Sequence, residues 1–323
     1  MEIFKTKQPI NLMGKKIHFF VISLILIIVS IFSVATKGLN FGVDFAGGTI
    51  IQVKYDKPVD LEVIRNSLKS ANQFKISSVT YFGNDDEVVI KMSASTSSMT
   101  NDVGDVVKQI LSKTGNFEIR RVDMVGPKVG DELTNKGIMA LSLGMIAILI
   151  YVGFRFEWRF AVGSVVALFH DITIAIGAIS LFQIEVNLDI LAALLTLLGY
   201  SINDTIIVFD RIRESVQKTN QRELNDLINE SVTQTLSRTT LTSLTTFFVV
   251  LTLYLFGGEI INGFSFTLLV GLIVGTYSSI FMASPLLLLF RFNITDYRAK
   301  QVEKLKKEQE KARMRAMFEK GTV

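Results

Sequence analysis

Two opposite charges lie in or beside long apolar runs of this sequence. Asp204 lies inside the run from Val186 to Phe209, and Arg238 stands at the head of the run from Thr239 to Phe256. A charged side chain in hydrocarbon costs at least ~3 kcal/mol, so a chain that keeps one of each sign uses them. The two residues predict an ion or proton step in which Asp204 gains and loses a proton.

Three more polar residues complete the predicted proton relay. His170 and Asp171 fall near the middle of another apolar run and form a titratable pair where burial is expensive. Asn203 adjoins Asp204 and can help to solvate its carboxylate. The predicted relay consists of Asp204, Arg238, His170, Asp171 and Asn203.

Each of these residues also has a structural explanation. Asp204 can form a fixed ion pair with Arg238 that only locks the helices together. Arg238 can reach the cytoplasmic headgroups with its long side chain, whereas a functional Arg238 would be held in the bundle by hydroxyls on its own helical stripe. His170 and Asp171 can form a buried hydrogen bond to a neighbouring helix. The hydroxyls near Arg238 are those of Thr235, Thr242 and Thr245.

The apolar runs predict an α-helical membrane protein with six transmembrane helices. Of the 323 residues, 49% are hydrophobic, and they cluster in blocks of roughly 18 residues or more, which is long enough to span a bilayer. The predicted spans are Ile17 to Val34, Gly137 to Phe154, Phe160 to Phe182, Val186 to Phe209, Thr239 to Phe256 and Phe264 to Phe290.

Lys and Arg residues predict the orientation. They are frequent in the N-terminal arm, in the second and fourth connections and after Phe290, and absent from the short loops 184–187 and 257–263. Positive residues stay in the cytoplasm, so both termini are expected there. Ser33-Val34-Ala35 resembles a signal-peptide cleavage site, but the first apolar run is longer than a signal peptide needs, which favours a retained span.

Composition excludes several classes of function. The chain has no cysteine and only two histidines, which excludes disulfides, thiol catalysis and a Cys/His metal cluster. It has no glycine-rich nucleotide-binding motif, so we expect no cofactor and no enzymatic activity. Its basic character belongs to the predicted cytoplasmic segments, which indicates attraction to membrane lipid and no nucleic-acid partner.

The one large soluble segment, residues 36–136, predicts a ferredoxin-like α+β domain. Its hydrophobic periodicity gives the order β-α-β-β-α-β, with a hairpin turn at Gly83-Asn84-Asp85-Asp86. The predicted elements are strand Thr49 to Tyr55, helix Val59 to Ala71, strands Ile76 to Phe82 and Glu87 to Met92, helix Met99 to Thr114 and strand Asn116 to Val125.

Smaller patterns predict packing and surface features. Apolar residues at helical spacing between Phe209 and Arg238 predict an amphipathic helix that lies on the cytoplasmic face of the membrane. Gly271 and Gly275, four residues apart, predict a face where two helices pack closely. The tail, with Glu303 and Lys307 one turn apart, predicts a solvated helix near anionic lipid.

Several long motifs resemble the SecF family of bacterial protein-export subunits. The string Gly199-Tyr-Ser-Ile-Asn-Asp-Thr-Ile-Ile-Val-Phe-Asp-Arg-Ile-Arg-Glu214 closely resembles the family signature. Four further stretches agree in the same order, as does the pair His170-Asp171, so the resemblance covers about residues 38–290. The four stretches begin at Gly38, Val125, Ser237 and Gly271.

The resemblance implies a half-transporter of the resistance-nodulation-division superfamily in the bacterial inner membrane. Its implied partners are SecD, the SecYEG channel, YajC, YidC and the exported polypeptide. The family uses the proton-motive force to promote late-stage export, and the positions of Asp204 and Arg238 match those used for proton passage, together with an aspartate of SecD. The small soluble domain matches the family's periplasmic domain.

In such a mechanism the segments that join the soluble domain to the first two spans must transmit the motion. The candidate hinge and coupling residues are Gly42, Asp44, Gly47, Gly48, Gly126 and Gly130, and the glycines can equally serve tight turns and close packing.

Two other functions fit part of the pattern. A small-molecule exporter of the same superfamily has similar intramembrane charges but usually a longer chain, and a structural scaffold keeps the packing glycines without proton coupling. The predicted organisation is a cytoplasmic arm with the first span (1–35), a periplasmic domain (36–136), five spans (137–290) with a cytoplasmic amphipathic segment (211–236), and a charged tail (291–323).

Overall fold

A computed structural model of the chain describes residues 9–71, 76–93, 103–218, 223–290 and 292–319. In it, six helices are long and apolar enough to cross a membrane, which confirms the predicted number. They are α1 (Lys16–Lys37), α5 (Pro127–Arg155), α6 (Trp158–Leu181), α7 (Leu188–Lys218), α8 (Leu224–Phe256), and α9 (Gly258–Ser278) continued by a π-helical segment (Ser279–Ala283) and α10 (Ser284–Leu289).

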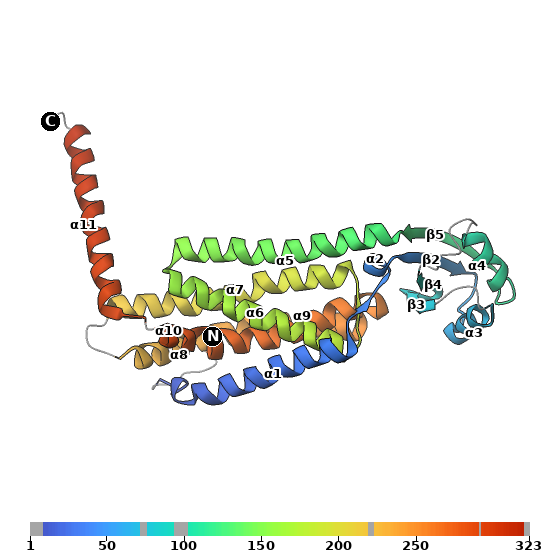
Figure 1. The fold of residues 1–323 in the computed structure, drawn as a ribbon, viewed down its shortest axis with the longest axis horizontal. Coiled ribbons are helices and arrows are strands. Elements are labelled where there is room, and N and C mark those ends of the chain that lie inside the picture. Colours follow the sequence, from blue (N-terminus) through green and yellow to red (C-terminus); the bar gives the residue numbers. More distant parts are fainter. Residues whose placement is uncertain (1–8, 72–75, 94–102, 219–222, 291, 320–323) are drawn as a thin grey trace.

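The six helices form an elongated bundle (Figure 1). A sheet domain lies beyond one end of the bundle, and α11 (Ile294–Glu319) lies at the opposite end, where α1 also begins after a short 3-10 helix (Met13–Lys15). The first and last described helices therefore lie at the same end of the bundle, as an even number of spans requires.

The sheet domain has the predicted ferredoxin-like topology. Its four strands pair in the order β3-β4-β2-β5, all antiparallel, which is the strand order of a β-α-β-β-α-β fold. The elements are β2 (Gly48–Tyr55), α3 (Leu61–Ala71), β3 (Ile76–Phe82), β4 (Asn84–Ser93), α4 (Val103–Leu111) and β5 (Phe117–Val125). The start of the predicted second helix, Met99 to Asp102, lies outside the described residues.

Alternation along the strands builds the core of this domain. Ile51 and Val53 of β2 face the buried side of the sheet, whereas Ile50 and Gln52 point to the other side. The two helices cover the buried side with fully buried Ile64 and other apolar residues. The predicted hairpin between β3 and β4 is confirmed, but its turn is shorter than the four residues expected, because Phe82 pairs with Asn84 and only Gly83, at φ +79°, lies between the strands.

Close contacts at small residues hold the bundle together. A methyl group at Gly177 of α6 would overlap Ser30 of α1, and one at Gly271 of α9 would overlap Leu197 of α7. One turn after Gly271, Gly275 of α9 packs against Ser201 of α7. The prediction that Gly271 and Gly275 form a packing face is confirmed, since α7 side chains lie directly against both positions.

The predicted amphipathic helix on the membrane surface is wrong. Residues 224–236 form the first turns of α8, continuous with the fifth span. Leu227, Ile228 and Val232 are fully buried in a cluster with Phe209 and Val216 of α7. The apolar stripe therefore packs against another helix, and a stripe alone does not distinguish lipid from protein as its neighbour.

Candidate functional site

Asp204 is buried between α7 and α8. Its side chain is 1% exposed, and Ser243 of α8 donates a hydrogen bond from Oγ to Asp204 Oδ2 over 3.0 Å. Within the part of the chain that the structure describes, Asp204 Oδ1 is also buried but has no hydrogen-bond partner. A buried carboxylate with one unpartnered oxygen is costly, so this side chain has a second partner or a proton to accept.

Arg238 does not pair with Asp204 in this structure. Its side chain is exposed on α8, and among the described residues no basic side chain lies within ion-pair distance of Asp204. Arg238 precedes Ser243 by five residues, which turns it about 140° around the helix from the face that meets Asp204. The fixed ion pair suggested by the sequence is therefore absent from this conformation.

The hydroxyls near Arg238 serve their own helix. Thr242 donates to the backbone carbonyls of Arg238 and Thr239, and Thr245 donates to that of Thr242. Thr235 bonds back to the helix in the same way. The expectation that they hold the guanidinium is not met, because Arg238 is exposed and, among the described residues, its side chain forms no hydrogen bond with these hydroxyls.

Asn203 also lies away from the buried carboxylate. It is exposed on α7 although it is the neighbour of Asp204 in sequence, because consecutive residues of a helix point about 100° apart. The structure thus places Asp204 inside the bundle, and Asn203 and Arg238 on exposed faces of α7 and α8.

His170 and Asp171 form a second buried polar cluster that links three helices. His170 Nδ1 lies 2.9 Å from Asp171 Oδ1, and the two side chains are 2% and 0% exposed. Asp171 Oδ2 accepts hydrogen bonds from Ser201 of α7 at 2.5 Å and Ser278 of α9 at 2.8 Å. In contrast to Asp204, both oxygens of Asp171 are therefore engaged.

Hydroxyls extend this cluster in two directions. Thr205, next to Asp204, donates to Ser279 in the π-helical segment over 3.3 Å. On the other side, the Tyr277 ring stacks near His170 and its hydroxyl donates to the backbone carbonyl of Phe19 in α1. The predicted relay does not include Ser243, Ser278, Ser279 or Tyr277, although all four lie in the motifs that begin at Ser237 and Gly271.

Asp44 joins the soluble domain to the helix that carries Asp204. It lies in α2 (Val43–Ala46), and its Oδ2 accepts a hydrogen bond from the backbone N–H of Leu188, the first residue of α7, over 3.0 Å. Beside it, β1 (Asn40–Phe41) pairs in parallel with β6 (Glu185–Val186), just before α7. Asp44 thus caps α7 from a distant segment, which position in the sequence alone does not indicate.

The predicted hinge glycines differ in their roles. Gly47 and Gly48 adopt φ values of +77° and +154°, and a methyl group at Gly48 would overlap the Met92 carbonyl. Gly130 packs against the Phe45 carbonyl, and Gly42 and Gly126 are the extended residues before α2 and α5. Close packing explains Gly130, whereas the backbone conformation requires glycine at Gly47 and Gly48.

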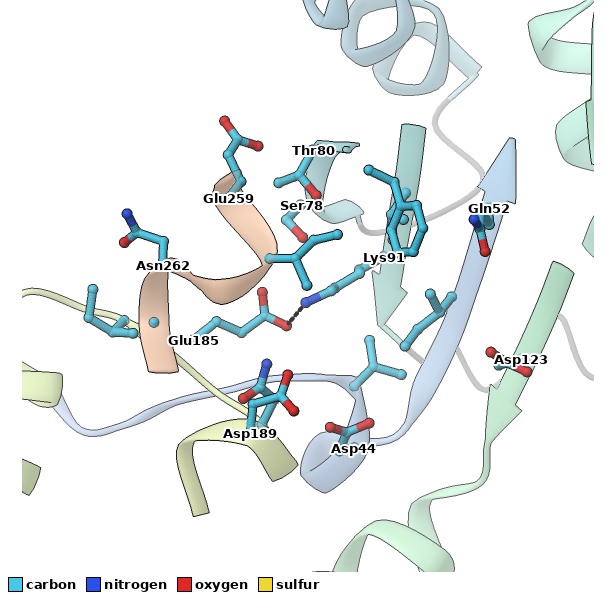
Figure 2. Close-up of a pocket in the computed structure, with 18 of the residues that line it drawn as sticks. Asp44, Gln52, Ser78, Thr80, Lys91, Asp123, Glu185, Asp189, Glu259 and Asn262 are labelled. Carbon is cyan, nitrogen blue, oxygen red and sulfur yellow. Dashed lines mark hydrogen bonds and ion pairs between the residues drawn. The ribbon is translucent and has the colours of Figure 1, made fainter. Parts of the chain in front are cut away.

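A cleft separates the open face of the sheet from the bundle. Its volume is about 470 Å³, and carboxylates from both sides line it, including Asp44, Asp123 and Asp189. Figure 2 shows Lys91 of β4 reaching across to Glu185, and the two side chains form an ion pair at 2.8 Å. This ion pair is a direct link between the sheet and the connection that leads into α7.

Comparisons with known proteins agree with the motifs. Residues 106–293 match the family described as "Protein export membrane protein SecD/SecF, C-terminal", and residues 32–59 match the "SecD/SecF GG Motif". The chain is 45% identical over 323 residues to the protein translocase subunit SecF of Helicobacter pylori (strain J99), covering 100% of both proteins. It is 42% identical over 286 residues to that of Escherichia coli O157:H7, covering 85% of this chain and 88% of the relative.

A solved structure has the same fold. The crystal structure of SecDF, a translocon-associated membrane protein from Thermus thermophilus, aligns with a TM-score of 0.76 and 33% identity over 90% of this chain. The alignment covers 40% of that longer protein. By motif, by identity along its whole length and by fold, the chain belongs to the SecD/SecF family of protein-export membrane proteins, on the SecF side of that family.

Proposed function

We propose that this chain pairs with SecD in the Sec protein translocase and uses the proton-motive force to promote late-stage protein export across the inner membrane. One observation carries the proposal: α7 holds a half-partnered buried carboxylate, Asp204, and its first residue is capped by Asp44 of the soluble domain's connection. A proton-dependent change on α7 is thereby linked to the domain that faces the exported chain.

We assign proton exchange to Asp204 and a positioning role to His170 and Asp171. Asp171 accepts hydrogen bonds from two helices and pairs with His170, so its charged form is well satisfied. Asp204 has one hydrogen bond and one unpartnered oxygen, so its charged form is less well satisfied. The carboxylate whose charged form is less well satisfied is the better proton acceptor.

The length of α7 supports transmission to the soluble domain. Asp204 lies 16 residues after Leu188, or ~24 Å along a continuous helix. A charge that crosses 100 mV gains ~2.3 kcal/mol, which shifts an equilibrium between two helix packings about fiftyfold. Neutralising Asp204 changes its contact with α8, and α7 carries that shift to Asp44 and β6.

The exposed positions of Asn203 and Arg238 support a site completed by SecD. Both side chains lie on exposed faces of α7 and α8 that lack a carboxylate partner within the described chain. In the family, an aspartate of SecD contributes to proton passage, and its approach to this face brings an acid next to Arg238. The resemblance implies SecYEG, YajC and YidC as further partners. In the proposed topology, both termini of this chain lie in the cytoplasm.

The decisive experiment is complementation of an export-defective strain by the Asp204→Asn variant. We expect normal assembly with SecD and loss of the export that depends on the proton gradient, because the amide cannot exchange a proton. Asp189→Asn, an exposed aspartate on the same helix, is the matched control and is expected to export normally. Undiminished export by Asp204→Asn would leave only a scaffold role for this chain.

A further inference from the structure

An apolar groove lies between α5, α6 and α7 at the end of the bundle nearest the sheet domain. Its volume is about 180 Å³. Leu141 of α5, Ile179 of α6 and Leu194 of α7 form its walls, and Phe41 and Phe45 of the connection into the sheet domain form its roof. The groove is separate from the buried polar cluster and from the cleft beneath the sheet.

The groove offers nothing to a polar ligand or to water. Its lining is apolar apart from Thr134, whose hydroxyl already donates to the backbone carbonyl of Gly130 over 3.0 Å. A cavity holds water only where several polar groups can bond to it. The occupant must therefore be apolar.

The groove is open on one side and continuous with the membrane-facing surface of α5. Phe41 and Ile138 at its edge are 46% and 61% exposed. Along the same helix, Leu143, Ile146 and Ile150 are exposed as well, as expected for a span that faces lipid. Figure 1 shows α5 along one edge of the bundle, with α2 at the end where the groove lies.

We propose that this groove binds an acyl chain of a phospholipid from the leaflet next to the sheet domain. A mobile acyl chain is the apolar group that surrounds α5 in a bilayer, and it has the narrow, flexible shape that a groove between helices accepts. The bound chain contacts Phe41, which pairs with Val186 between β1 and β6, and Phe45, which follows Asp44 in α2. Lipid thereby supports the connection between the first span and the sheet domain.

Photocrosslinking tests the proposal. The full chain, assembled with SecD, is placed in vesicles of phosphatidylethanolamine that carries a diazirine within one acyl chain, and labelled residues are mapped by mass spectrometry. Leu194 and Leu198 are both buried leucines of α7, at 6% and 3% exposure, and Leu194 lines the groove whereas Leu198 does not. We expect several times more labelling at Leu194 than at Leu198. Equal labelling of the two, or labelling confined to the exposed face of α5, overturns the proposal.

A matched pair of variants tests occupancy. Leu141→Trp adds bulk inside the groove, whereas Leu143→Trp makes the same change two residues away on the exposed face of α5. We expect labelling at Leu194 to fall severalfold in the first variant and to stay at the wild-type level in the second. Unchanged labelling in Leu141→Trp contradicts an acyl chain in the groove. If that variant does not assemble, Leu191→Phe, also in the groove wall, is measured in the same way.

Discussion

Ser243 of α8 is the only described side chain that hydrogen-bonds the carboxylate of Asp204, through one oxygen. A prediction based on charge does not include Ser243, because serine is uncharged and is one of the small residues expected in a membrane helix. Its importance comes from its position one helix away from a buried acid. A hydrogen bond to a charged group contributes about 1.5–3 kcal/mol, enough to alter which protonation state is populated.

Removing this hydroxyl tests the role of Ser243. Ser243→Ala leaves both oxygens of Asp204 without a donor from the described chain, so we expect gradient-dependent export to fall severalfold while assembly with SecD persists. Ser243→Thr keeps the hydroxyl and is expected to retain most activity. The measurement is the rate of export into inner-membrane vesicles with a defined proton gradient. Equal rates for the alanine variant and the wild-type chain would show that this hydrogen bond does not matter for coupling.

At the scale of helices, small residues decide how the elements meet. The six apolar runs are sufficient to predict six spans, because every backbone group in hydrocarbon must be bonded within a helix. They do not predict partners: α1 packs on α6 at Gly177, and α9 packs on α7 at Gly271. Because apolar patterns do not identify packing partners, they also gave the wrong prediction for the first turns of α8, whose apolar stripe packs against α7.

A pair of glycine substitutions separates packing from helix propensity. Alanine favours an isolated helix by about 1 kcal/mol over glycine, so a Gly→Ala change is stabilising where space allows. At Gly153 of α5 the added methyl group would lie 3.8 Å from Ala161, an ordinary contact, whereas at Gly177 it would overlap Ser30. We expect Gly153→Ala to hold or raise the melting temperature of the detergent-solubilised protein, and Gly177→Ala to lower it. Similar melting temperatures for the two variants would contradict the close approach of α1 and α6.

At the scale of the whole molecule, three links tie the sheet domain to the start of α7. They are the cap provided by Asp44, the pairing of β1 with β6, and the ion pair between Lys91 and Glu185. The first two involve the connection from α1, whereas the ion pair comes directly from the sheet (Figure 2). The ion pair is partly exposed, and such pairs contribute little to stability, so it can break and re-form at little cost.

Locking this link tests whether the sheet domain must move relative to the bundle. The sequence has no cysteine, so Lys91→Cys combined with Glu185→Cys creates the only two thiols of the chain. We expect a short bis-maleimide crosslinker to abolish export by this double variant assembled with a cysteine-free SecD. Each single variant, treated in the same way, controls for alkylation and for loss of the ion pair and should export at its untreated rate. Full export by the crosslinked chain would rule out motion at this link.

The six spans, the ferredoxin-like domain, the family and the buried acids can all be predicted from the amino-acid sequence. These follow from local patterns: apolar runs for spans, alternation for strands, and charges in apolar segments for candidate sites. The partners of these acids depend on helix packing: Asp204 accepts a hydrogen bond from Ser243 and does not pair with Arg238, and Asp171 accepts hydrogen bonds from Ser201 and Ser278. Neighbouring residues of a helix point 100° apart, and the packing of glycines that are distant in sequence sets which helix faces meet, so local patterns do not predict these partners.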